Sequence, residues 1–151
     1  MDTYDMKLWP MNMPLISVSK KNLEIITEYQ EIPKTAEQKT KLFFVLTSLF
    51  KNAIQAMSQV EKKTLAISIS RTEDADQLHQ SIFIKVNDNG SGIKADNLEK
   101  VFRHGFSQTK GSYGFELHNC ANYIQDMGGK IWVESEGEGK GATFVLEFPQ
   151  K

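Results

Sequence analysis

The stretch TAEQKTKLFFVLTSLFKNAIQAMSQ, residues 35–59, decides the fold because its hydrophobic residues follow one regular period. These residues recur at steps of three and four: Leu42, Val45, Leu46, Leu49, Ala53 and Ala56. Such spacing places them on one face of an α-helix. Thr35, followed by Glu37 and Gln38, is a start signal, since its side chain can accept from a free N–H of the first turn. The stretch therefore predicts a long amphipathic helix.

Segments of β-type sequence on both sides of this helix predict strands. TLAISISRT (64–72) and SIFIKVND (81–88) alternate in polarity, and the segment between them is too long for a tight turn. KIWVESEGEGKGATFVLEFP (130–149) indicates a strand, a glycine-rich turn and a second strand. ISV (16–18) and NLEIITEY (22–29) are rich in β-branched and apolar residues, which suggests further strands.

The order of helices and strands indicates the fold class. ELHNCANYIQDM (116–127) predicts a second amphipathic helix, which ends at Gly128-Gly129, and ADNLEKVF (95–102) has short helical character. The strands do not alternate singly with helices, which argues against a doubly wound sheet. We therefore expect an α+β fold, a two-layer α/β sandwich with helices packed on one face of a mixed β-sheet.

The composition is that of one globular domain. The chain has 151 residues, of which 40% are hydrophobic and 25% charged, and its net charge is −1. This charge gives no general attraction to nucleic acid or to an anionic membrane, and no apolar run reaches the ~20 residues that span a bilayer. The single cysteine, Cys120, excludes an internal disulfide and fits a reducing compartment. We expect a linker or docking arm over residues 1–21, a folded domain over 22–151, and a cytoplasmic location.

Three polar motifs lie where predicted elements end. In KNAIQA, Asn52 offers an amide oxygen, a ligand type that suits hydrated Mg²⁺. In NDNGSGI, Asp88 ends a strand before Gly90 and Gly92, so a carboxylate stands beside backbone that a flat ligand can approach. A carboxylate accepts from an exocyclic amine, which suits adenine better than the O6 edge of guanine. GSYGFELHNC (111–120) is a glycine loop opening a helix, whose free N–H groups bind anions. Taken singly, each motif also fits an ordinary solvated side chain, loop or turn.

The order of the motifs is more specific than any one of them. SLFKNAIQA is similar to an N box, DNGSGI to a first glycine box, VFRHGFSQTK to an F box and lid, SYGFEL to a second glycine box, and GKGATF to the last. In this order they resemble the ATP-binding catalytic domain of sensor histidine kinases. That domain belongs to the Bergerat-fold ATPase/kinase superfamily, together with type II topoisomerase, Hsp90 and mismatch-repair ATPase domains. The resemblance covers about residues 22–149.

The resemblance implies ATP and Mg²⁺ as cofactors and assigns residues to them. By similarity, Asn52 ligates a Mg²⁺ that bridges the ATP phosphates. Asp88 accepts from the adenine amine, supported by Gly90 and Gly92. Thr143 helps to hold a water beside Asp88.

The same resemblance assigns residues around the phosphates. Phe102 and Phe106 anchor the lid, although core packing explains these rings equally well. Lys110 reaches the phosphates and joins Asn52 as a catalytic residue, and Lys51 is a weaker candidate. Three further residues are assigned to the nucleotide-binding surface: Ile93, Gly114 and Leu117.

Some residues depart from the family pattern. Ser48 stands where the topoisomerase and Hsp90 branch has a water-activating glutamate, which argues against that branch. The second glycine box has Ser112 and Glu116 where glycines are expected, and only Gly114 is kept. A carboxylate a few Å from a triphosphate costs about 1–4 kcal/mol at surface-like dielectric. We hypothesise that Glu116 caps the helix and mimics a phosphate in the absence of nucleotide. Two interpretations stay open, a working kinase domain and a degenerate signalling module that binds nucleotide weakly or not at all.

The implied reaction is transfer of the ATP γ-phosphoryl group to a histidine on a separate dimerising helical domain, with a response regulator further downstream. The histidines of this chain, His79, His104 and His118, do not stand in a long helix with the acidic surroundings of an acceptor. Cys120 reads as a small buried hydrophobe. We expect a monomeric domain without direct membrane contact, either a fragment of a membrane-anchored kinase or a stand-alone catalytic partner.

Overall fold

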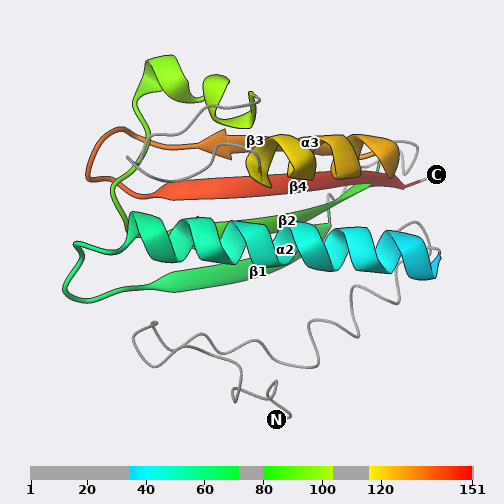
Figure 1. The fold of residues 1–151 in the computed structure, drawn as a ribbon, viewed down its shortest axis with the longest axis horizontal. Helices are drawn as coiled ribbons and strands as arrows, with labels where there is room; N and C mark the ends of the chain where they lie inside the picture. Colours follow the sequence, from blue (N-terminus) through cyan, green and yellow to red (C-terminus); the bar gives the residue numbers. More distant parts are fainter. Residues whose placement is uncertain (1–34, 72–79, 104–115, 151) are drawn as a thin grey trace, which may run out of the picture.

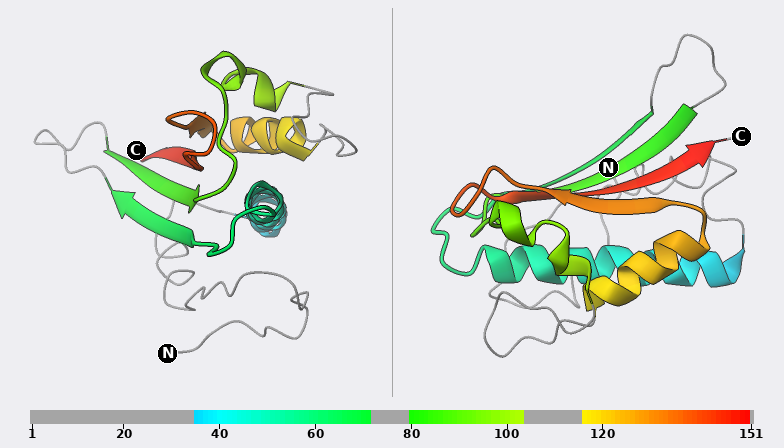
Figure 2. Two further views of the ribbon diagram at one scale, coloured as in Figure 1. Left: turned by 90° about the vertical axis from the view of Figure 1, so that its left-hand side faces the viewer. Right: turned by 90° about the horizontal axis from the view of Figure 1, so that it is seen from above.

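The computed structural model of the chain describes residues 35–71, 80–103 and 116–150. These residues form two layers, with helices α2 (Ala36–Ala56) and α3 (Glu116–Asp126) side by side on one face of a four-stranded sheet (Figure 1). Views from two other directions show that both helices cover the same face (Figure 2). The two-layer α/β sandwich expected from the sequence is therefore confirmed.

Helix α2 forms where the sequence predicts it. Its N-cap is Thr35, whose Oγ1 accepts a hydrogen bond from Gln38 N–H at 3.1 Å. Glu37 in the first turn complements the positive end of the helix dipole. The helix ends at Ala56, slightly before the predicted boundary. Of the predicted stripe, Leu42, Val45, Leu49 and Ala53 are buried, whereas Leu46 and Ala56 are half-buried. Ser48 is buried as well, which the apolar pattern did not predict.

The sheet is antiparallel in all its described pairings. Its strands are β1 (Leu65–Arg71), β2 (Gln80–Asp88), β3 (Lys130–Glu134) and β4 (Ala142–Gln150), in the spatial order β1-β2-β4-β3. The register places Asp88 between Leu65 of β1 and Ala142 of β4. The strands predicted over 16–18 and 22–29 lie outside the described residues, so the parallel component of the expected mixed sheet is not tested.

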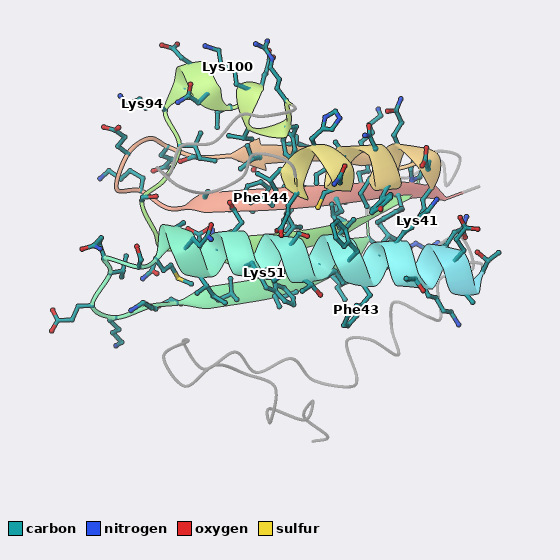
Figure 3. The ribbon with its side chains drawn as sticks, viewed as in Figure 1. Lys41, Phe43, Lys51, Lys94, Lys100 and Phe144 are labelled. Atoms are coloured by element: carbon teal, nitrogen blue, oxygen red, sulfur yellow. The ribbon has the colours of Figure 1, made fainter. Side chains whose placement is uncertain are left out.

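The hydrophobic core lies between the sheet and the helices. Alternate residues of β2 and β4 point toward the helices, because side chains alternate along a strand. The largest fully buried side chains are Phe144, Phe148, Leu49, Met57, Ile82, Ile84, Ile124, Leu146, Val45 and Val86, while Val145 is equally buried but on the opposite face of β4. Phe144, labelled in Figure 3, also meets the ring of Phe102 edge-on at a centroid distance of 6.0 Å. Burial of these side chains is the main term that stabilises the fold.

Two short 3₁₀ turns stand where the sequence indicates a short helix. They are η2 (Ala95–Asn97) and η3 (Lys100–Phe102), and η3 packs beside α3. Within residues 35–71, 80–103 and 116–150, no helix combines the length and the apolar character that crossing a bilayer requires.

Candidate functional site

Asp88 ends β2 as a buried carboxylate with one free oxygen. The residue is 3% exposed, and its Oδ1 accepts a hydrogen bond from Gly90 N–H at 2.8 Å. Its Oδ2 is buried and has no hydrogen-bond partner among the described residues. Burial raises the pKa of Asp88, and backbone hydrogen bonds from Gly90 and Ala142 offset part of that rise. A buried acceptor without a partner is costly, so a ligand that donates to Oδ2 would remove that cost.

The loop after Asp88 docks on the C-terminal end of α2. Ser91 N–H donates to the Ala56 carbonyl at 2.8 Å, and a Cβ at Gly90 would collide with the same carbonyl. The close approach of two backbones therefore requires glycine at position 90. This contact fixes Asp88 relative to the helix that carries Asn52.

The same loop is joined to the turn between β3 and β4. Gly92 has a φ of 71°, and a Cβ there would collide with the Gly137 carbonyl. Two backbone hydrogen bonds connect the loops, from Gly139 N–H to the Ser91 carbonyl at 2.7 Å and from Gly141 N–H to the Gly90 carbonyl at 3.1 Å. We call residues 90–92 and 137–141 together the glycine interlock. In Figure 1 it lies at the same end of the sheet as the C-terminus of α2.

Asn89 braces the glycine interlock from the side of β1. Its Oδ1 accepts from Thr64 N–H at 3.0 Å and its Nδ2 donates to the Lys62 carbonyl at 2.8 Å. Sequence reasoning missed this role, because an Asn-Gly pair reads as an ordinary loop. Within DNGSG, however, an amide that can donate and accept was a usable signal.

Ser135 holds the other side of the glycine interlock. Its Oγ accepts from Ile93 N–H at 3.0 Å and donates to the Gly141 carbonyl at 2.6 Å. The hydroxyl thus links the end of β3 to both loops. Nothing in the sequence distinguishes Ser135 from a surface serine, because its partners are backbone groups that are distant along the chain.

Asn52 lies on α2 one turn after Ser48 and is half-buried. Residues four apart share a helix face, so Asn52 is on the side of α2 where Ser48 contacts Cys120 of α3. Burial raises the pKa of Cys120 to about 11, although the hydrogen bond with Ser48 opposes the rise. Cys120 is fully buried, which confirms it as a small core residue.

Comparison with known proteins decides the family of this arrangement. A family model described as histidine kinase-, DNA gyrase B-, and HSP90-like ATPase matches residues 37–151. The chain belongs to this family. The sensor protein FixL of Bradyrhizobium diazoefficiens is 34% identical over 105 residues, which cover 70% of this chain and 20% of FixL. The sensor histidine kinase ZraS of Escherichia coli is 33% identical over 141 residues, which cover 91% of this chain and 28% of ZraS.

Solved structures of histidine kinases share the fold. A nucleotide-free catalytic domain of the histidine kinase ThkA is 28% identical, with a TM-score of 0.59 over 74% of this chain and 67% of that one. The mycobacterial sensor histidine kinase MprB, at 16% identity, has a TM-score of 0.60 over 73% of this chain and 70% of that one, and shows the fold alone. This chain is a histidine-kinase-like ATPase domain with the Bergerat fold, and the family implies ATP binding.

One residue assigned to this ATPase site lies elsewhere. Thr143 pairs with Asn87, and its Oγ1 accepts from Asn87 Nδ2 at 2.7 Å. Asp88 instead pairs with Ala142, and neighbouring residues of a strand point to opposite faces. The expectation that Thr143 shares a water with Asp88 is therefore wrong, because Thr143 faces away from the helix layer.

Three other residues assigned to the ATPase site lie in the hydrophobic core or pack against it. Ile93 is buried, and Phe102 and Leu117 are partly buried against the core cluster. The ring of Phe102 packs on Phe144, which favours its structural role. The Nδ1 of His118 lies 3.2 Å from the Phe102 carbonyl oxygen, so this histidine contacts the F-box end rather than solvent alone.

The remaining assigned residues are only partly described. Phe106, Lys110, Ser112, Gly114, His79 and His104 lie outside the described residues. Lys51 is exposed on α2 (Figure 3). Glu116 is the first residue of α3 and is exposed. An exposed carboxylate does not fill an anion site, so its position gives no support to phosphate mimicry.

Proposed function

We propose that this domain binds Mg-ATP and transfers the γ-phosphoryl group to a histidine on a separate helical dimerisation domain. The observation that carries the proposal is the free Oδ2 of Asp88, buried at the end of β2 beside the glycine interlock. The match of the ATPase family model to residues 37–151 supports the nucleotide class.

The free oxygen of Asp88 suits adenine in particular. The exocyclic amine of adenine is a donor, and a carboxylate can only accept when ionised. The O6 edge of guanine would instead face Oδ2 with a second acceptor, which leaves both groups unsatisfied. Gly90 and Gly92 support this site indirectly, because their close backbone approach to Ala56 and Gly137 fixes the loop that follows Asp88. Adenine nucleotides are therefore the proposed ligand class.

Magnesium is proposed to enter with the nucleotide phosphates. In the described part of the chain, no group of three or more His, Cys, Asp or Glu side chains is placed to hold a metal. Mg²⁺ often uses one or two protein oxygens together with phosphate oxygens, and the Asn52 amide supplies one such ligand. When bound, the ion would neutralise phosphate charge, while Lys110 and the helix N-terminus at Glu116 would orient the phosphates. Phe106, Gly114 and Leu117 remain proposed parts of the same site.

The phosphoacceptor is proposed to lie on another domain. His118, the one histidine in the described residues, contacts the Phe102 carbonyl and Asn122 and sits in the first turns of α3. FixL and ZraS are several times longer than the matched region, so a helical acceptor domain in the parent protein or in a partner is consistent with them. A response regulator would receive the phosphoryl group afterwards, in the cytoplasm.

Calorimetric titration of Mg-ADP, and of a non-hydrolysable Mg-ATP analogue, tests the proposal. The wild-type chain should bind both with micromolar affinity. Asp88→Asn should abolish binding, because its amide offers a donor toward the adenine amine, whereas the exposed Asp96→Asn should not change it. Glu116→Gly should tighten binding about tenfold, since it removes a like charge near the phosphates.

Two results would contradict the proposal. Absence of binding by both the wild-type chain and Glu116→Gly would exclude a nucleotide site. Binding by Glu116→Gly alone would identify the natural chain as a degenerate signalling module. Phosphoryl transfer itself is tested by adding a helical phosphoacceptor domain and radiolabelled ATP, and labelling of its histidine is the expected result.

A further inference from the structure

We propose that His118 is a positioning residue for the phosphate end of the nucleotide. It ties the first turns of α3 to the end of η3, and so sets the direction in which the N-terminus of α3 points. This inference rests on the proposed nucleotide binding and gives a role in it to a residue that was not assigned to the site from sequence.

The hydrogen bonds of His118 define its tautomer. A carbonyl oxygen only accepts, so Nδ1, 3.2 Å from the Phe102 oxygen, carries the hydrogen and donates. In the neutral ring Nε2 is then the acceptor, and it can receive a hydrogen bond from Asn122 Nδ2, which lies 3.3 Å away. Asn122 stands four residues later on the same face of α3. The imidazole is therefore oriented from both sides.

The carbonyl that His118 holds belongs to a fixed residue. The ring of Phe102 packs edge-on against Phe144, which is 1% exposed at the centre of the core. The His118–Phe102 hydrogen bond thus connects the beginning of α3 to the core through η3. Cys120 and Ile124, which are fully buried, anchor the remainder of the helix against the sheet.

Orientation matters because a helix N-terminus binds anions through N–H groups that point along the helix axis. A small rotation of the first turn would misdirect these groups, while the Asp88 site on β2 would be undisturbed. Loss of the His118 hydrogen bond should therefore weaken ligands that carry phosphates and spare ligands that lack them.

Titration of Mg-ADP and of adenosine into the full chain separates these effects. His118→Leu has similar bulk but no donor, and should weaken Mg-ADP about tenfold while adenosine affinity stays within twofold. His118→Asn should restore most of the affinity for Mg-ADP, because its Nδ2 takes the place of Nδ1. Asn122→Ala, an exposed change, should weaken Mg-ADP about two- to threefold, since it frees the imidazole to rotate.

Several outcomes would overturn the inference. One is an unchanged Mg-ADP affinity in His118→Leu, and another is an equal loss for adenosine and Mg-ADP. Failure of His118→Asn to improve on His118→Leu also contradicts it. If His118→Leu does not fold, an unchanged Mg-ADP affinity in Asn122→Ala is decisive against it. A wild-type chain that binds neither ligand would overturn the proposed function, and this inference with it.

Discussion

At the scale of single residues, the buried Asp88 carboxylate lowers the stability of the domain but offers an acceptor to the proposed ligand. Its carboxylate is buried with one free oxygen, so the nucleotide-free domain carries the cost of an ionised group that it does not fully satisfy. Asp88→Asn removes the charge and keeps an oxygen for Gly90 N–H. We expect this variant to be more stable than wild type at pH 7 by about 0.5–2 kcal/mol, measured by urea unfolding without nucleotide.

The difference in stability between wild type and Asp88→Asn is expected to depend on pH, in a direction set by the pKa of Asp88. Burial raises the pKa of Asp88 above the unfolded value of 3.8, so the wild-type domain binds a proton more tightly when folded. Its stability relative to Asp88→Asn is therefore highest below pH 3.8 and is lost as pH rises through the raised pKa. If the stability advantage of Asp88→Asn over wild type grew as pH falls, this account would be contradicted. Asp96→Asn, at an exposed position, is the control.

Ala142 and Thr143 provide a second test at the residue scale. The pairing of Asp88 with Ala142 predicts that Ala142→Val crowds the carboxylate and lowers nucleotide affinity at least tenfold. Thr143→Val should leave the affinity within twofold, because Thr143 faces the other side of the sheet and bonds Asn87. Calorimetric titration of Mg-ADP measures both. A larger effect at Thr143 than at Ala142 would show that the register is shifted.

At the scale of elements, the glycine interlock predicts unequal effects of two alanine substitutions. Gly92 and Gly128 have φ values of 71° and 79°, so alanine is strained at both. A Cβ at Gly128 meets no atom within 4 Å, whereas one at Gly92 collides with the Gly137 carbonyl. Gly128→Ala should cost about 1 kcal/mol and Gly92→Ala about 2–4 kcal/mol in urea unfolding. Equal costs would mean that the two loops are not in contact.

The elements themselves were largely predictable, and the contacts between them were not. The stripe from Leu42 to Ala53 and the alternation along residues 81–88 are local signals, and both gave the correct element. The choice between Ala142 and Thr143 needed the strand register, in which a slip of one residue reverses the face. The role of Ser135 depended on backbone partners from two distant loops, which carry no side-chain signature.

At the scale of the whole molecule, a buried and an exposed phenylalanine are expected to contribute very differently to stability. Phe144 is 1% exposed at the centre of the core, whereas Phe43 is 72% exposed on α2 and extends away from α3 (Figure 3). Phe144→Ala should cost about 3–5 kcal/mol, a large share of the stability of a small domain. Phe43→Ala should change stability by less than about 0.5 kcal/mol.

Thermal and urea unfolding of both variants measure this contrast. If Phe144→Ala does not fold, Phe144→Leu provides the milder test and should cost about 1–1.5 kcal/mol. A substantial loss for Phe43→Ala would show that its side chain is covered in solution.

The two-layer architecture followed from local sequence because helix and strand periods are set by burial on one face. Asp88 and the glycines after it stood out in the sequence by their residue types, and the structure brings them together at the end of β2. Their part in binding adenine stays a prediction. The positions of Glu116 and His118 relative to that site could not be predicted, because both depend on how α3 begins.

The glycine interlock also constrains the order in which a ribosome can produce a finished domain. Residues 90–92 leave the exit tunnel well before residues 137–141, which they need as backbone partners. Asp88 must likewise wait for Ala142, since β4 pairs with β2 on one side and with β3 on the other. A nascent chain that ends before β3 and β4 can form α2 but lacks the backbone partners of residues 90–92 and of Asp88. Contacts between residues that are distant along the chain slow folding, so this end of the domain is expected to form only after residues 142–150 have been translated.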